Sequence, residues 1–439
     1  MIITERYDIS EDYQIMTILK ISGGHPLYGD VTVGGAKNST VALIPAAILA
    51  DSPVELDMVP DILDVHNLML ILQSMNVTSD FSDGVLNIDP TNILEGELPG
   101  KAIKSLRASY YFMGALLGKF HRATISFPGG DNIGPRPIDQ HIRAFKALGA
   151  EVSESDDSVD INATEHGLHG ASIFFDMVSV GATINTILAA VKADGVTTIS
   201  NAAKEPEIID IASFLNSMGA KIRGAGTDVI RIQGVNHLQA KATHTIIPDR
   251  IEAGTYLTLA AAIGKGINVK NVIPEHLQAY TAKLIEAGVQ LEIGEDSIYV
   301  PKTGKLNGIE VKTAPFPGFA TDLQQPITPM LFKADDDSVI HDTIYPERQN
   351  HIAQLQKMGA NIRVNPTDNS IIISKSDNLH GTTVQAGEIR AGASLVIAGL
   401  MAQGQTTIEN ADNILRGYDN ITNKLTNLHA NVQMIDQDD

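Results

Sequence analysis

Cysteine and tryptophan are absent from this 439-residue chain, and aromatic residues make up only 5% of it. Without cysteine the chain can form no disulfide, no thiolate metal site and no cysteine nucleophile. No apolar run reaches the roughly 18 residues of a membrane span. The hydrophobic content of 43% must therefore be packed mainly with Ala, Ile, Leu and Val. The chain is too long for one hydrophobic core, so we expect at least two domains.

Cationic residues are also scarce, with 32 Lys and Arg against 52 Asp and Glu and a net charge of -20. An acidic protein is a poor general binder of nucleic acid, so we expect no nucleic-acid partner. Residues Met1 to Tyr13 carry acids instead of the basic and apolar regions of a signal peptide, and we expect a soluble cytoplasmic protein without membrane insertion. The histidines show no metal-ligand spacing, so no metal is expected.

A four-residue signature recurs six times, and its second residue returns every 69 to 73 positions. In four copies the third residue is glycine, as expected where a helix ends in a residue with φ > 0. We therefore predict six repeated units that each contain two helices and several strands, in an α/β architecture. The copies are Ser74-Met-Asn-Val77, Ala147-Leu-Gly-Ala150, Ser217-Met-Gly-Ala220, Glu286-Ala-Gly-Val289, Lys357-Met-Gly-Ala360 and Asn427-Leu-His-Ala430.

Each unit also contains an Ala-rich stretch that we interpret as an amphipathic helix, followed in several units by a β-branched strand such as Val196–Ser200. These stretches are Ser39–Ala50, Ser109–Gly118, Ala182–Ala193, Ala253–Gly264, Gln324–Lys333 and Ala391–Gln403. Six units suggest two halves of three, with a hinge near His244–Arg250. We predict one domain of residues 38–246 and another of 1–37 plus 247–439. The N-terminal strands, Met16–Ile21 and Asp30–Val33, are expected to pair with the second half.

Cations recur at equivalent places in the units. Lys37, Arg107, Arg250 and Arg390 begin Ala-rich stretches, and Arg136, Arg348 and Arg416 stand near the start of second helices. The third and fifth units have Ser179-Val-Gly181 and Thr321-Asp322 at the first of these places. A cation at a helix N-terminus opposes the helix dipole, but with free backbone N–H groups it attracts anions. Each cation could instead pair with a neighbouring acid. For the whole set we favour an anion site between the domains.

Residues 127–137 are rich in glycine and proline and include Asp131 and Arg136. Glycine lets a backbone approach a ligand closely, and proline fixes its path. Such a segment is either a mobile lid or a plain connector. Because it leads into Arg136, we predict that it closes over the anion site.

Several motifs of the chain are similar to those of one family, the UDP-N-acetylglucosamine 1-carboxyvinyltransferases, over almost all of residues 17–435. The motifs are Gly35-Ala-Lys-Asn38, Arg107-Ala-Ser109, Pro128-Gly-Gly130, Ile133-Gly134, Arg136-Pro137, Val178-Ser-Val-Gly-Ala-Thr183, Glu205-Pro-Glu207, Pro248-Asp-Arg-Ile-Glu252, Thr321-Asp322 and Arg416-Gly-Tyr418. The resemblance implies two inside-out α/β barrels of three units each. It also implies transfer of the enolpyruvyl group of phosphoenolpyruvate (PEP) to the 3′-hydroxyl of UDP-N-acetylglucosamine, with release of phosphate and without a metal or organic cofactor.

The resemblance implies a role for each matching residue. Lys37, Arg136 and Arg416 would hold PEP, with Asn38 beside Lys37 and support from Arg348 and Arg390. Asp322 would accept the proton of the sugar hydroxyl, and Ile344 would line the same pocket. The nucleotide sugar would be bound by Arg107, by Arg136, Pro137, Ile138, Asp139 and Gln140 on the uridine side, and by Ser179, Val180 and Gly181 around the diphosphate. Addition at a vinyl carbon needs a proton donor as well as a base, and Asp131 would be that donor.

The sequence departs from the family at several positions. The family usually has cysteine where this chain has Asp131, so we expect insensitivity to fosfomycin, an epoxide that alkylates the loop thiol. Met177, Pro346-Glu347 and Leu415 replace polar, basic or acidic neighbours of site residues, and Gln140 replaces an apolar residue. Two alternatives remain: an enolpyruvyl transferase acting on shikimate 3-phosphate, or a weakly active or non-catalytic protein that binds UDP-N-acetylglucosamine.

Overall fold

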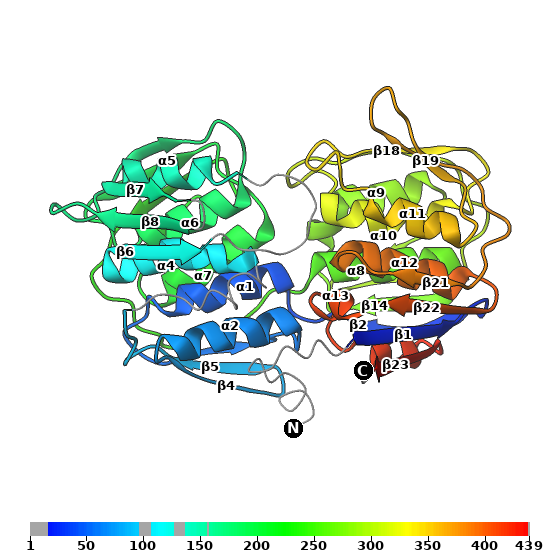
Figure 1. Cartoon of the computed structure of the whole chain (residues 1–439), viewed down its shortest axis with the longest axis horizontal. Coiled ribbons are helices and arrows are strands. Elements are labelled where there is room, and N and C mark those ends of the chain that lie inside the picture. The colour runs from blue at the N-terminus through cyan, green and yellow to red at the C-terminus, as the bar shows by residue number, and fades with distance from the viewer. Residues whose placement is uncertain (1–15, 96–106, 127–136, 156–157, 438–439) are drawn as a thin grey trace.

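The computed structural model describes residues 16–95, 107–126, 137–155 and 158–437, which form two lobes side by side (Figure 1). One hydrophobic core contains buried residues from Ala36 to Ile246, and the other contains buried residues from Leu19 to Val33 and from Ile251 to Ala430. We call these the first and second lobes. The domain boundaries 38–246 and 1–37 plus 247–439 stay a prediction, with which the two cores are compatible.

The first lobe contains three groups of elements, one for each repeated unit. The first unit has α1 (Lys37–Ala47), β3 (Val54–Asp57), α2 (Leu63–Ser74), β4 (Thr78–Ser82), β5 (Val85–Asp89) and β13 (His244–Thr245). The second has η1 (Arg107–Tyr110), α4 (Tyr111–Phe120), β6 (Arg122–Ser126), α5 (Asp139–Ala147), β7 (Ala150–Glu154) and β8 (Ser158–Ala163). The third has β9 (Ser172–Phe174), α6 (Val180–Ala190), β10 (Val196–Ser200), α7 (Pro206–Ser217), β11 (Lys221–Arg223) and β12 (Val229–Gln233).

The second lobe repeats this arrangement. Its first unit has β2 (Leu27–Thr32), α8 (Arg250–Ile263), β14 (Gly264–Lys270), η2 (Pro274–Leu277), α9 (Gln278–Glu286), β15 (Glu292–Ile293) and β16 (Ser297–Val300). The next has β17 (Glu310–Lys312), η3 (Thr321–Leu323), α10 (Gln324–Leu331), β18 (Ser338–His341), α11 (Asn350–Lys357), β19 (Ile362–Val364) and β20 (Ile371–Ile373). The last has β21 (Thr383–Gln385), α12 (Ile389–Met401), β22 (Gln405–Glu409), α13 (Asp412–Leu415), α14 (Ile421–Asn427), β23 (Asn431–Gln437) and β1 (Met16–Ser22).

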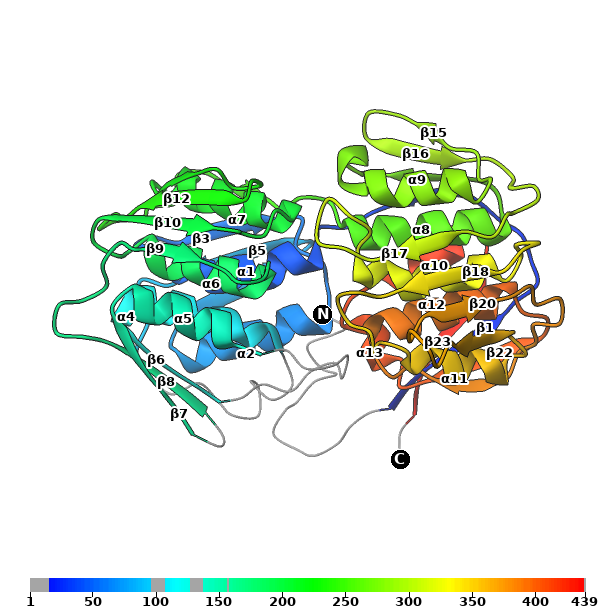
Figure 2. The ribbon, with the colours of Figure 1, turned by 90° about the horizontal axis from the view of Figure 1, so that it is seen from above.

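Six sheets are formed by the described residues, one for each predicted unit. Their strand orders are β13-β3-β5-β4, β6-β8-β7 and β11-β12-β10-β9 in the first lobe, and β15-β16-β14-β2, β17-β18-β20-β19 and β21-β22-β1-β23 in the second. The predicted pairing of the N-terminal strands is confirmed, because β1 lies between β22 and β23 and β2 pairs in parallel with β14. The Ala-rich first helices of the units lie inside each lobe, whereas the sheets and the partly exposed second helices lie around them (Figure 2).

The repeat signature marks the same structural event in every unit. Helices α2, α5, α7, α9, α11 and α14 each end at the first residue of a signature. The third residue has a positive φ in all six copies, from 59° at Asn76 to 110° at Gly219. This left-handed residue ends the helix and starts the following strand. The prediction therefore holds even where asparagine or histidine replaces glycine.

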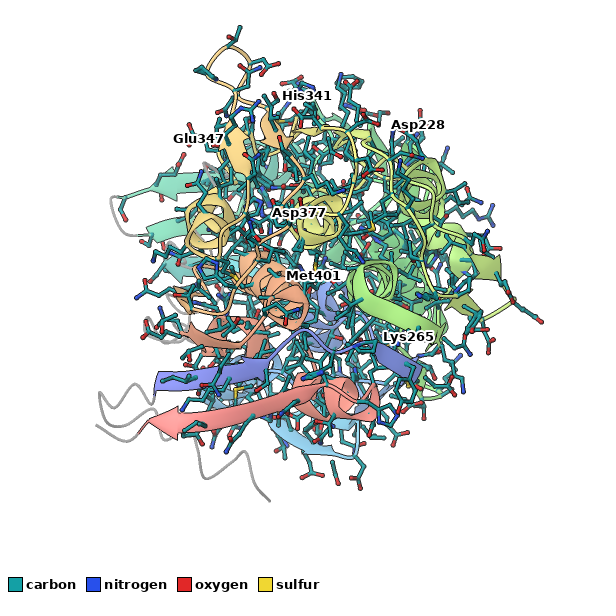
Figure 3. The ribbon with its side chains drawn as sticks, turned by 90° about the vertical axis from the view of Figure 1, so that its right-hand side faces the viewer. Asp228, Lys265, His341, Glu347, Asp377 and Met401 are labelled. Carbon is teal, nitrogen blue, oxygen red and sulfur yellow. The ribbon has the colours of Figure 1, made fainter. Side chains whose placement is uncertain are left out.

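The Ala-rich helices are confirmed in position but were wrongly interpreted as amphipathic. In α8 every residue from Ile251 to Ala262 is buried, and in α12 every residue from Ile389 to Leu400 is buried. A helix that is enclosed on all sides is apolar all round. These helices form the centre of each lobe, where small side chains allow close packing. Figure 3 shows α12, whose last residue Met401 is labelled, above the sheet that contains β1.

The chain crosses between the lobes twice, and the two crossing segments lie against each other. Ala36 N–H donates to the Ile247 carbonyl at 2.7 Å, and Asp249 N–H donates to the Gly34 carbonyl at 3.0 Å. Between them Gly35 is packed so tightly that a Cβ atom would lie 1.8 Å from the Met58 carbonyl oxygen. Only glycine fits this position. The predicted hinge at His244–Arg250 thus forms one of two paired connections.

Candidate active site at the junction of the lobes

The crossing segments bring the N-termini of two central helices together. Asp249 caps α8, because its Oδ1 accepts hydrogen bonds from the N–H groups of Ile251 at 2.7 Å and Glu252 at 3.1 Å. Its Oδ2 accepts a hydrogen bond from Lys37 N–H, at the first position of α1, at 3.1 Å. Lys37 and Arg250 are the first residues of α1 and α8. The two predicted cations therefore stand at helix N-termini joined through one carboxylate.

The side chains of Lys37 and Arg416 meet at Asp64, a residue that the sequence analysis did not identify. Lys37 Nζ lies 2.9 Å from Asp64 Oδ2, and Arg416 Nε lies 3.0 Å from Asp64 Oδ1. The Asp64 side chain is only 1% exposed. Asp64 and Lys37 belong to the first lobe and Arg416 to the second, so one buried carboxylate joins cations from both lobes. Asp64 sits in the first turn of α2, where acids are common, so its sequence position carried no signal.

A second cluster surrounds Asp322 in the second lobe. Arg348 Nη1 donates to Asp322 Oδ1 at 2.6 Å, and Arg390 Nη2 lies 3.7 Å from Asp322 Oδ2. The Arg348 guanidinium also holds the fully buried Glu388 through two bonds, Nε to Oε1 at 3.0 Å and Nη2 to Oε2 at 2.8 Å. Glu388 was not predicted either. Asp322 is thus brought together with Arg348 and Arg390, the two arginines predicted to support the PEP site.

Charge balance in this cluster keeps the arginines protonated. Burial acts to lower the pKa of Arg348, but the carboxylates of Asp322 and Glu388 outweigh it and raise that pKa above its ordinary value. Burial likewise opposes the charge of Arg390, and Tyr418, Asp322 and Asp249 raise its pKa on balance. The Arg390 guanidinium also lies over the Tyr418 ring, 5.2 Å from its centroid. Leu323, which follows Asp322, packs against Gly254 near the start of α8, so this cluster lies beside the N-terminus of that helix.

Asp342 organises the loop that carries Ile344. Its Oδ1 accepts from the N–H groups of Ile344 at 3.0 Å and Tyr345 at 2.9 Å, and its Oδ2 accepts from the Thr321 hydroxyl at 2.6 Å. Thr321 precedes Asp322, so one carboxylate fixes both segments. Ile344 is half-buried. Asp342 is a third site residue that was missed, since it follows a strand like any turn residue.

The predicted diphosphate residues form the N-terminus of α6. Ser179 caps this helix by accepting a hydrogen bond from Ala182 N–H at 3.2 Å, and the first turn contains no acidic residue. Ser179, Val180 and Gly181 are half-buried. A helix N-terminus of this kind presents backbone N–H groups and a positive dipole end to an anion.

The predicted uridine residues begin α5, and Gln140 ties them to the segment before α6. Gln140 Nε2 donates to Asp139 Oδ2 at 2.8 Å, and its Oε1 accepts from Asp176 N–H at 3.1 Å. Arg143, one turn further along α5, pairs with Asp176 Oδ2 at 2.5 Å. Pro137 and Asp139 are exposed, and Ile138 is buried. Gln140 therefore joins the two predicted halves of a nucleotide site.

Asp131 and Arg136 lie outside the described residues, as does most of the segment 127–137, and the side chain of Arg107 is not described. Asn38 is half-buried beside Lys37 on α1. Arg416 follows the short helix α13 instead of beginning α14.

Within the described part of the chain, no group of three or more His, Asp or Glu residues could hold a metal ion. No helix in this part is long and apolar enough to cross a membrane.

Five of the predicted cations have side chains that the structure describes, and each of them lies beside an acidic residue. Beyond the pairs above, Arg250 Nε lies 3.5 Å from Glu207 Oε1. Burial raises the pKa of Glu207, although Arg250 opposes this. Pairing with acids, the alternative for each single cation, is therefore what the structure contains. Each of these pairs lies at the junction of the lobes or beside Asp322.

His351 in α11 provides a test of this buried cluster. Burial, and then the charge of Arg348, lower the pKa of His351 to about 3 from its ordinary 6.5. The folded protein therefore keeps the His351 ring neutral, whereas the unfolded chain binds a proton at this ring below about pH 6.5. The free energy of unfolding is thus unaffected by His351 above pH 6.5 and decreases as the pH falls towards 3. We expect His351→Gln to remove on the order of 2–4 kcal/mol of acid destabilisation between these values. Urea unfolding at several pH values measures it, and equal pH slopes in both proteins would contradict it.

Comparison with solved structures defines the class of fold. The enolpyruvyl transferase NikO from Streptomyces tendae superimposes with a TM-score of 0.87 over 97% of this chain and 100% of that one, at 23% sequence identity. An EPSP synthase from Acinetobacter baumannii superimposes with a TM-score of 0.71 over 96% of this chain and 100% of that one, at 18% identity. The fold is therefore that of the enolpyruvyl transferases, as the family resemblance of the sequence implied.

Sequence comparison defines the family. The family model of EPSP synthase (3-phosphoshikimate 1-carboxyvinyltransferase) matches residues 21–425. A UDP-N-acetylglucosamine 1-carboxyvinyltransferase 2 from Lactiplantibacillus plantarum is 69% identical over 414 residues, which cover 94% of this chain and 97% of that protein. A UDP-N-acetylglucosamine 1-carboxyvinyltransferase from Streptococcus pneumoniae is 55% identical over 421 residues, 96% of this chain and all of the other. The chain belongs to the EPSP synthase family and, within it, to the UDP-N-acetylglucosamine 1-carboxyvinyltransferases.

Proposed function

We propose that the chain acts in the cytoplasm, where it transfers the enolpyruvyl group of PEP to the 3′-hydroxyl of UDP-N-acetylglucosamine and releases phosphate. This is the first committed step of peptidoglycan precursor synthesis. The observation that carries the proposal is the convergence of Lys37 and Arg416, from opposite lobes, on one buried position. Two cations held apart by a carboxylate can bind another anion of similar size, such as the carboxylate or phosphate of PEP.

The reaction places specific demands on the site. The hydroxyl oxygen attacks C2 of PEP while a base removes its proton and an acid protonates C3. The resulting tetrahedral intermediate keeps both the phosphate and the carboxylate, so fixed cations must surround it. Loss of the C3 proton and of phosphate then restores the double bond. We assign the base to Asp322, which Arg348 and Arg390 hold in position, and the acid to Asp131.

We assign each substrate to its own set of residues. We infer that PEP lies between the domains 38–246 and 1–37 plus 247–439, against Lys37, Arg136 and Arg416, with Asn38 nearby. Arg348 and Arg390 support this site through Asp322. We infer that the nucleotide sugar lies against Arg107, the residues from Pro137 to Gln140, Ile344, and the α6 N-terminus at Ser179 to Gly181. The hydrogen bond from Asp176 N–H to Gln140 supports this placement, because it joins the uridine and diphosphate sides.

Phosphate release from PEP and UDP-N-acetylglucosamine tests the reaction. We expect release only when both substrates are present, and a loss of at least about 100-fold in kcat for Asp131→Asn, the size of a general-acid contribution. Activity that survives in Asp131→Asn would assign the acid to another residue. Absence of release by the parent protein, together with binding of the nucleotide sugar, would replace the transferase by a non-catalytic binding protein. Activity with shikimate 3-phosphate would indicate the other substrate.

Fosfomycin provides an independent prediction. The chain has no cysteine, and a carboxylate is a far weaker nucleophile towards an epoxide than a thiolate. We expect no time-dependent loss of phosphate release on incubation with fosfomycin and no mass increase of the protein. The control is Asp131→Cys, which should be inactivated. A covalent adduct on the parent protein would show that the prediction is wrong.

A further inference from the structure

Three cations gather on the outer face of the third sheet, away from the proposed active site. Lys221 and Arg223 lie on β11, and Arg231 lies on β12. The register places Arg223 directly opposite Arg231 and Lys221 opposite Gln233. All four side chains are exposed, whereas Ile222 and Ile232 between them face the core. Figure 2 shows β10 and β12 on the outside of the first lobe.

This arrangement is unfavourable without a bound partner. Like charges directly opposite each other on neighbouring strands destabilise a sheet. No acidic residue among the described ones forms an ion pair with Lys221, Arg223 or Arg231, although the chain has 20 more acids than bases. Some other exposed cations, such as Lys270 beside Asp30, do have such a partner. The positive charge of this face is therefore not offset by the fold.

Protection of the sheet edge does not account for the cluster. Charged residues on an edge strand prevent pairing with another chain, and β11 is the edge strand of its sheet. This explanation covers Lys221 and Arg223. It does not cover Arg231, because β12 lies between β11 and β10 and has no free edge.

The same side chains line a hollow in the surface. Its volume is about 400 Å³, and it is lined by the three cations, by Asn216 and Gln233, and by Val196 at its apolar side. Small-molecule sites have volumes of about 300–1,000 Å³. Arginine guanidinium groups present several N–H donors in one plane and match the oxygens of a phosphate. The hollow thus combines the size of a small-ligand site with the donors of a phosphate site.

We propose that this hollow, the β11–β12 pocket, binds a small anion that carries a diphosphate group. Arg223 and Arg231 approach the two phosphates from neighbouring strands, and Lys221 supplies the third positive charge. None of the lining residues belongs to the proposed active site. The pocket is therefore a second ligand site of the chain, and it does not depend on the identity of the transferase substrates.

Calorimetric titration with inorganic pyrophosphate, in low salt and without divalent metals, tests the proposal. The active site would also bind this probe, both at the PEP cations and at the α6 N-terminus, so every titration contains saturating UDP-N-acetylglucosamine, and the reference protein carries Lys37→Ala and Arg416→Ala and is checked for folding by circular dichroism. We expect the reference protein to bind one pyrophosphate, and addition of Arg223→Gln and Arg231→Gln to weaken that binding at least tenfold. The matched control adds Lys312→Gln and Arg363→Gln, two exposed cations on β17 and β19 of the second lobe, and should bind as the reference does.

Each outcome decides the proposal. Absence of pyrophosphate binding to the reference protein, or equal binding after the Arg223 and Arg231 substitutions, would overturn it. Binding of an acidic peptide of ten glutamates, without binding of pyrophosphate, would also overturn it and assign the face to a protein partner. If pyrophosphate binds, adenosine diphosphate distinguishes the source: tighter binding than pyrophosphate indicates a nucleotide, and weaker binding indicates the free diphosphate.

Discussion

Replacement of Asp64 by asparagine is expected to lower kcat/KM for PEP by on the order of 100-fold, the effect of a misplacement of about 1 Å in a catalytic group. Asp64 is buried between Lys37 Nζ at 2.9 Å and Arg416 Nε at 3.0 Å. An amide cannot neutralise either cation, and its NH₂ group would face one of two donors. Both cations would then move, and with them the proposed anion site that spans the lobes.

The measurement separates a role in this site from a general loss of structure. Initial rates are recorded with each substrate varied in turn. We expect the KM for PEP to rise much more than the KM for UDP-N-acetylglucosamine, because Lys37 and Arg416 are the cations that we propose to hold PEP. Asp61→Asn is the matched control: Asp61 precedes the same helix, is 38% exposed and pairs with His66, so its effect should stay within twofold. An unchanged KM for PEP in Asp64→Asn would refute the role of Asp64.

Replacement of Glu388 by glutamine is expected to destabilise the second lobe by about 3–5 kcal/mol, the range for breaking a buried ion pair. Glu388 is fully buried and accepts two hydrogen bonds from Arg348, which is 4% exposed. Glutamine keeps the shape of the side chain but removes its charge. The NH₂ group of glutamine would also replace one of the two carboxylate oxygens that accept hydrogen bonds from Arg348. One N–H donor of Arg348 would then have no acceptor.

Urea unfolding measures this effect as a shift of the transition midpoint. The double variant Glu388→Gln with Arg348→Met should be less destabilised than Glu388→Gln alone, because it no longer buries an uncompensated charge. The control is Glu310→Gln, an exposed residue 3.6 Å from His341, which should change stability by less than about 0.5 kcal/mol. A midpoint for Glu388→Gln equal to that of the parent protein would contradict the prediction.

The sequence was sufficient to predict those features that local chemistry repeats in every unit. The end of each second helix was predicted because a left-handed residue is needed there, and all six copies have one. The positions of the central helices followed from their Ala-rich composition. Their burial on all sides was not predicted. A helix of alanines with a few threonines was interpreted as having one buried face, because the sequence does not show which elements surround it.

The acidic partners in the candidate site could not be predicted in the same way. Arg416 meets Asp64 across 352 positions of the chain, and the pair exists only because the two lobes are packed together. Glu388 meets Arg348 across 40 positions, from the start of the neighbouring helix. The cations were found because they recur at equivalent places. Their partners do not recur, so each depends on contacts that only the folded chain supplies.

The order of strands in the last sheet has a consequence for how the chain is made. Among the described residues β1 is the first strand to be synthesised, and both of its neighbours, β22 and β23, come from residues 405–437. The first lobe can complete its core while synthesis continues, since its buried residues end at Ile246. The second lobe cannot close its last sheet until residues 431–437 of β23 have left the ribosome. A chain truncated by a few tens of residues would therefore expose β1 as an unpaired apolar strand, a template for aggregation.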